Sequence, residues 1–127
     1  MGKDEKKAFK WYLKSAKIGN SEAQYKLGYF YKYGVGINND EKKAFDWYLK
    51  SAEAGNSKAQ YELGYFYKYG VGINKDEKKA FELYLESAEA GNSDAQYELG
   101  YAYKYVDNDK RKALEYYLKF AKRECKH

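Results

Sequence analysis

The sequence predicts an all-α protein in which antiparallel helix pairs stack into a solenoid. Residues 4–39 recur at 40–75 with six of thirty-six aligned positions changed, a third copy starts at Asp76 and a shortened fourth near Asp109. Repetition with a period of twenty to fifty residues is typical of solenoids. Each copy holds two segments with helical periodicity, and the chain has 11 Gly and no Pro, so glycines must separate the helices.

The first helix of the unit is predicted at 40–54, with copies at 4–17 and 76–90. Asp40 is a good N-cap, and Gly55 suits the left-handed residue that follows a helix. Its apolar residues share one face at helical spacing: positions 44, 45, 48, 49 and 52.

The second helix of the unit is predicted at 57–69, with copies at 21–33 and 93–105. Ser57 and Gln60 have the spacing of a capping box. Gly64 lies inside the helix, where glycine costs about 1 kcal/mol relative to alanine. Its recurrence in each copy therefore predicts a close approach of a neighbouring helix.

A seventh helix is predicted at 109–124, which gives about seven helices in a single repeat domain over 1–127. Short links between helices make neighbours antiparallel. Glu124 and Cys125 replace the Gly-Asn turn, so we expect the array to stop there. The domain consists of an N-terminal half unit, the helix at 4–17, followed by repeats at about 21–54, 57–90 and 93–124.

The charge pattern favours a protein partner over nucleic acid. The formal net charge is +5, but it is +5 over residues 1–36, 0 over 37–72, −4 over 73–108 and +4 over 109–127. A nucleic-acid binder usually has a continuous basic stripe, and here an acidic unit interrupts it. With 20% aromatic residues the chain is also unlike disordered proteins, which are poor in aromatics.

The sequence predicts a soluble, intracellular and most simply cytoplasmic protein. Cys125 is the single cysteine, so no disulfide can form within the chain. The first residues have no apolar stretch of the kind found in signal peptides, and no apolar run is long enough to cross a membrane. We expect no membrane partner.

The whole unit resembles the Sel-one-like repeat (SLR), a relative of the tetratricopeptide repeat. The matching positions are Ala23, Leu27, Gly28, Tyr31, Gly34, Gly36, Asp40, Lys43, Ala44, Trp47, Tyr48, Ala52 and Gly55. The resemblance implies a right-handed α-solenoid with the Tyr-rich helices on the concave side. It also implies the family's usual function as a scaffold or adaptor for proteins in signalling and quality control.

The chain departs from one branch of that family. Some secreted members carry a Cys pair in each repeat, and a few of those have been linked to β-lactam hydrolysis. This chain has no such pairs, so that activity is not carried over. The near identity of the units indicates either recent duplication or a consensus-like repeat.

The candidate binding site is a strip of tyrosines along the concave groove, with one lysine per unit beside it. Tyr25, Tyr29 and Tyr33 have i, i+4, i+8 spacing, which places them on one side of a helix. The full set is Tyr25, Tyr29, Lys32, Tyr33, Tyr61, Tyr65, Lys68, Tyr69, Tyr97, Tyr101, Lys104 and Tyr105. Tyrosine suits binding hot spots. The alternative is that these rings pack between repeats.

Other motifs have structural explanations. Gly34-Val35-Gly36 has no Lys-Ser/Thr at the spacing of a phosphate-binding loop, so these glycines are turn residues. Cys125 and His127 give at most two metal ligands, whereas structural zinc needs four. Trp11 and Trp47 are expected in the core.

The sequence therefore predicts a non-catalytic scaffold that binds a peptide or helix, with no cofactor and no metal. No oriented acid–base or nucleophile pair is present. The alternatives are a structural or self-associating repeat module and, less favoured, a nucleic-acid binder that uses aromatic stacking and lysines. The partner's identity stays open.

Overall fold

The structure is a computed structural model that describes residues 3–105 and residue 119. Residues 3–105 form six α-helices and contain no strand. The helices are α1 (Lys3–Lys17), α2 (Ser21–Tyr33), α3 (Glu41–Glu53), α4 (Ser57–Tyr69), α5 (Glu77–Glu89) and α6 (Ser93–Tyr105). The predicted seventh helix at 109–124 lies outside the described residues, except for Lys119.

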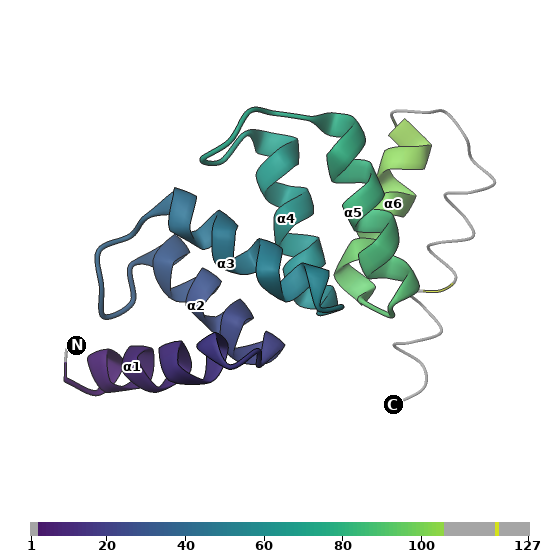
Figure 1. Ribbon diagram of the computed structural model, residues 1–127. Helices are drawn as coiled ribbons and strands as arrows, with labels where there is room; N and C mark the ends of the chain where they lie inside the picture. The colour runs from purple at the N-terminus through teal and green to yellow at the C-terminus, as the bar shows by residue number, and fades with distance from the viewer. Residues whose placement is uncertain (1–2, 106–118, 120–127) are drawn as a thin grey trace.

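The helices pack in sequence order, each against the next along the chain. Their axes turn progressively from α1 at one end of the array to α6 at the other (Figure 1). This arrangement confirms the predicted all-α solenoid. We call α2, α4 and α6 the Tyr-rich helices, and α1, α3 and α5 the Lys-Ala-Phe helices.

The helix N-termini are capped as predicted in α3 and α5 but not in the Tyr-rich helices. The Asp40 carboxylate accepts a hydrogen bond from the Lys43 N–H at 3.1 Å. In α4, however, the N-cap is Asn56, whose Oδ1 accepts from the Ala59 N–H at 3.0 Å. The predicted capping box at Ser57 is therefore wrong, because asparagine caps a helix as well as serine does and precedes it by one residue.

The glutamine of that expected box has a different function. Its Nε2 atom donates to a backbone carbonyl near the end of the preceding helix. These hydrogen bonds are Gln24 to Ala16 at 3.1 Å, Gln60 to Ala52 at 3.3 Å and Gln96 to Ala88 at 3.0 Å. Each of them fixes a Tyr-rich helix to the Lys-Ala-Phe helix before it.

Close helix approach at the mid-helix glycines is confirmed. A Cβ atom added at Gly64 would lie 2.9 Å from Cδ1 of Tyr84, and one added at Gly28 would lie 2.5 Å from Cδ1 of Tyr48. Both distances are shorter than any normal contact, so the tyrosine rings of α3 and α5 lie directly on the bare backbone of the preceding Tyr-rich helix.

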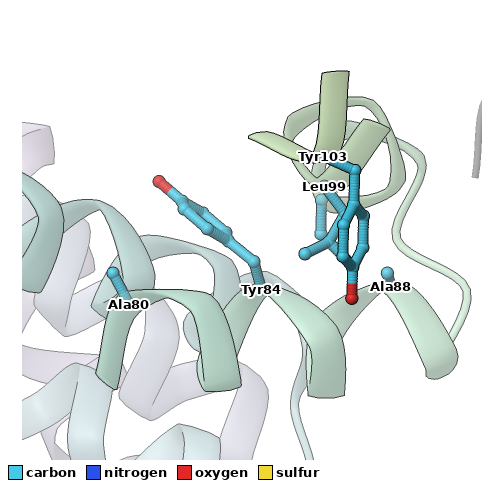
Figure 2. Packing of buried hydrophobic residues seen from close by; sticks show 6 residues of the cluster. Ala80, Tyr84, Ala88, Leu99 and Tyr103 are labelled. Carbon is cyan, nitrogen blue, oxygen red and sulfur yellow. The ribbon is translucent and has the colours of Figure 1, made fainter. Parts of the chain in front are cut away.

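The core is divided into clusters, one for each helix pair. The best enclosed one joins α3 and α4 and contains Tyr48, Leu63 and Phe66. In the next pair, Leu99 and Tyr103 of α6 lie against α5 (Figure 2). Because each cluster is built mostly from neighbouring helices, the array needs no single central core.

Trp11 corrects the prediction that both tryptophans belong to the core. Trp47 of α3 packs against the cluster of α1 and α2, and Leu83 packs in the same way one repeat later. Trp11 occupies the corresponding position of α1 but is 66% exposed. α1 is the first described helix, so no preceding repeat among the described residues packs on this face.

Candidate functional site: the tyrosine strip

The predicted strip tyrosines form three exposed ring pairs, one on each Tyr-rich helix. Tyr29 lies beside Tyr33 with ring centroids 4.7 Å apart. The copies of this pair are Tyr65 with Tyr69, at 4.7 Å, and Tyr101 with Tyr105, at 4.6 Å. All six rings are exposed. The one-turn spacing of the residues along each helix brings the rings together.

The first tyrosine of each trio has different surroundings. Tyr25 is half-buried with its ring centroid 5.7 Å from that of Tyr48, and Tyr61 lies 5.6 Å from Tyr84 in the same way. These two rings lie between repeats. Tyr97, the third member of this group, is exposed.

The lysines of the strip lie over the tyrosine rings. The Lys32 Nζ is 5.0 Å from the ring centroid of Tyr33 and 4.7 Å from that of Tyr65, so it joins two repeats. Lys68 lies 5.3 Å from Tyr69, and Lys104 lies 4.9 Å from Tyr105. Cation–π contacts of this length hold the rings in place.

Two of these lysines also form ion pairs with the next repeat. Lys32 Nζ is 3.0 Å from Glu62 Oε1, and Lys68 Nζ is 3.6 Å from Glu98 Oε1. Burial alone would lower the pKa of Lys32, but the hydrogen bond to Glu62, the charge of that carboxylate and the contact with Tyr33 together outweigh burial and raise it. The positive charges of Lys32 and Lys68 are therefore partly neutralised.

Sequence reasoning missed the glutamates. The position of Glu62 and Glu98 is occupied by Lys26 in α2. Among the described residues, α4 and α6 each follow a Tyr-rich helix that supplies a lysine, and both carry the glutamate. No described Tyr-rich helix precedes α2, which carries a lysine at this position. The sequence does show that the charge changes at the position of Lys26, Glu62 and Glu98, whereas the lysine six residues later is present in every copy. The contact joins residues of different repeats, so only the structure connects them.

Alkaline pH should destabilise the array through the tyrosines between repeats. Burial, with a smaller contribution from the charge of Glu98, raises the pKa of Tyr61 to about 12. Burial also raises the pKa of Tyr84 well above its ordinary value. The unfolded chain releases tyrosine protons near pH 10. Stability is therefore full below about pH 10 and falls as the pH rises towards 12.

Melting curves across this pH range check the prediction. The double variant Tyr61→Phe/Tyr84→Phe should lose stability less steeply than the wild type. As a control, the exposed Tyr69→Phe should keep the wild-type slope. Equal slopes for all three proteins would show that these rings do not cause the alkaline loss.

The described residues contain no group of three or more His, Cys, Asp or Glu side chains placed to hold a metal ion. Cys125 and His127 lie outside them. In the same part of the chain, no helix has the length and apolar character needed to cross a membrane. Gly34 and Gly36 have φ values of +68° and +73°, which identifies them as turn residues.

A family model and solved structures match most of this chain. The family model of the Sel1 repeat matches residues 1–20, 21–56, 57–92 and 93–125. No curated protein sequence gives a significant match.

Three solved structures are similar to this chain. A Sel1 repeat protein from Oxalobacter formigenes is 35% identical with a TM-score of 0.83, and the match covers 93% of this chain and 48% of that one. The protective antigen c5321 of uropathogenic Escherichia coli, described as displaying an SLR fold, is 36% identical with a TM-score of 0.85, over 94% of this chain and 26% of that one. Cysteine-rich protein B of Helicobacter pylori is 28% identical with a TM-score of 0.66, over 68% and 65%. The chain thus spans about half of the first structure and a quarter of the second.

Proposed function

Because the chain belongs to the Sel1 repeat family, we propose that it is a non-catalytic scaffold that binds a peptide or helix of a partner protein along the tyrosine strip. Sel1 repeat proteins are generally protein-interaction scaffolds. Of the twelve predicted strip residues, we place binding on the six paired tyrosines of α2, α4 and α6 together with Lys32, Lys68 and Lys104. Tyr25 and Tyr61 are left out because their rings lie between repeats, and Tyr97 because it occupies the same repeat position.

The observation that supports this proposal is the recurrence of an exposed tyrosine pair in three successive repeats. Tyrosine combines a large apolar ring with a hydroxyl and has few rotatable bonds, so it loses little entropy on binding. Contiguous exposed aromatic surface is typical of protein-binding sites. Each of the six residues keeps at least 38% of its surface exposed, so a partner can contact all of them.

Electrostatics favour a peptide over nucleic acid. Lys32 and Lys68 are each held by a glutamate of the next repeat. A phosphate backbone would have to displace these carboxylates or lie next to them, which opposes binding. A peptide that contacts the rings by apolar and hydrogen-bonding groups does not meet this obstacle.

Peptides selected from a random display library on the immobilised protein would test the function. We expect them to bind the soluble protein with an affinity that changes little with salt. Phosphate contacts would instead weaken binding by about 10³–10⁵ between about 50 and 200 mM salt for six to ten contacts. A steep loss of this kind with single-stranded nucleic acid as the better ligand would contradict the proposal. Sedimentation without peptide, showing concentration-dependent assembly through the strip, would favour the self-associating alternative.

A further inference from the structure

Among the three described Tyr-rich helices, α6 borders a pocket at the position where α2 and α4 carry a phenylalanine ring. The position of Phe30 and Phe66 is occupied by Ala102 in α6. A cavity of about 360 Å³ lies beside Ala102. Its walls include Ala80, Phe81 and Tyr84 of α5, and Lys68, Glu98 and Tyr101 line it as well.

The preceding repeat shows what this site is shaped to hold. The Phe66 ring stacks on Phe45, with centroids 6.5 Å apart and an interplanar angle of 27°. It meets the Tyr48 ring edge-on at 5.6 Å and 87°. The Lys32 Nζ lies 5.7 Å from its centroid. The Phe66 ring is therefore enclosed by two aromatic rings and one ammonium group.

The same three partners surround Ala102. A shift of one repeat converts Phe45, Tyr48 and Lys32 into Phe81, Tyr84 and Lys68, all of which line the cavity. In Figure 2 the Tyr84 ring projects on the side of Ala80, away from Leu99 and Tyr103. The walls of a phenyl site are thus present, and the phenyl ring is missing.

The ion pair at this site is also looser than its copy. Lys32 and Glu62 are 3.0 Å apart, with 16% and 18% of their side chains exposed. Lys68 and Glu98, beside the cavity, are 3.6 Å apart, with 35% and 29% exposed. Solvent and ligands therefore reach the pocket between Lys68, Glu98 and Tyr101. Two of these, Lys68 and Tyr101, are strip residues, so the pocket lies next to the proposed binding surface.

We propose that this pocket receives a phenylalanine side chain of the peptide bound along the tyrosine strip. The inference rests on the proposed function and adds an anchor residue to it. A ring placed there would regain the stacked, edge-on and cation–π contacts that Phe66 makes in its own repeat. Anchors of this kind, seated in a pocket and surrounded by a polar rim, dominate the binding energy of many interfaces. Apolar cavities of about 150 Å³ in other proteins bind benzene, so the volume is sufficient.

A small aromatic probe tests the pocket without any knowledge of the partner. We expect fluorobenzene to bind the full chain, detected by its ¹⁹F resonance. Ala102→Phe should abolish this binding and raise the Tm, because the new ring fills the pocket in the orientation of Phe66. The matched control Ala54→Phe adds the same ring at an exposed position and should leave probe binding unchanged. Absence of probe binding to the wild type, or equal binding by Ala102→Phe, would overturn the proposal.

Binding experiments with selected peptides test the pocket and the tyrosine strip separately. Peptides selected on the wild type should contain a phenylalanine whose replacement by alanine weakens binding about thirtyfold, the effect of losing one hot-spot side chain. That replacement should make little difference on Ala102→Phe, which already excludes the ring. Selected peptides that bind both proteins equally would refute the pocket and leave the strip intact. Peptides unaffected by loss of the strip tyrosines would refute the strip, whereas the fluorobenzene result would still decide the pocket.

Discussion

Gly64→Leu should destabilise the array by about 3 kcal/mol or more, at or beyond the upper end of ordinary overpacking. Even a Cβ atom at this position would lie 2.9 Å from two atoms of the Tyr84 ring. Tyr84 is almost fully buried and its ring packs against Tyr61 and the backbone at Gly64, so it must shift to admit a larger side chain. Leucine has a higher helix propensity than glycine by somewhat under 1 kcal/mol. This gain is smaller than the steric penalty, so the net effect is a loss, measurable by chemical denaturation.

Two further variants identify the cause. Lys50→Leu introduces a leucine at an exposed position of α3 and should change the stability little. In the background of Tyr84→Ala the ring is gone, so the additional loss caused by Gly64→Leu should shrink sharply. Equal melting temperatures for Gly64→Leu and Lys50→Leu would remove the argument for a close helix crossing at this glycine.

Replacing Tyr65 and Tyr69 together by serine should abolish peptide binding and leave the fold intact. Both rings are exposed, and hot spots tend to lie near the centre of an interface. Each ring at a hot spot contributes about 2 kcal/mol or more, so a micromolar affinity should weaken by about 10³-fold. Titration calorimetry measures the affinity, and circular dichroism verifies the helix content.

Two controls define what this result means. Trp11→Ser removes an exposed aromatic ring outside the strip and should not alter binding. Tyr61→Ser removes the ring that packs on Tyr84 and should lower the Tm, in contrast to the exposed pair. If the Tyr65/Tyr69 variant melts far earlier than the wild type, these rings belong to the core and not to a binding site.

Much of the fold could be predicted because the same local sequence patterns recur in each repeat. Helical periodicity, Asp40 as a cap and Gly55 as a left-handed residue are local properties of the chain. The mid-helix Gly64 was informative because it recurs despite its low helix propensity. Its reason, the Tyr84 ring, lies on the next helix but at a fixed offset in the repeat.

Features that depend on which neighbour is present could not be predicted in this way. Trp11 and Trp47 occupy the same position of the unit, yet one is exposed and the other packs on the preceding repeat. Ser51 is a small polar residue that is fully buried in the structure, where its Oγ donates to the Ser21 carbonyl of the preceding repeat at 2.7 Å. Periodicity within one helix does not reveal contacts made between repeats.

The candidate site shows the same division. The tyrosine spacing predicted one face of each helix, and the structure divides each trio according to its neighbours. Tyr25 and Tyr61 lie between repeats, whereas Tyr29 and Tyr65 are exposed. Ala102 was not singled out from the sequence, although it replaces the phenylalanine found at this position of α2 and α4. The walls of the pocket come from three helices, so only the structure shows them.

A backbone NMR titration with a selected peptide tests the central claim most directly. If the tyrosine strip binds the partner, amide resonances of residues 29–33, 65–69 and 101–105 shift on addition of peptide. The amide resonances of the exposed residues Asp46, Lys50 and Glu82 on the Lys-Ala-Phe helices do not shift. Shifts concentrated at these three positions, with the strip resonances unchanged, would contradict the account.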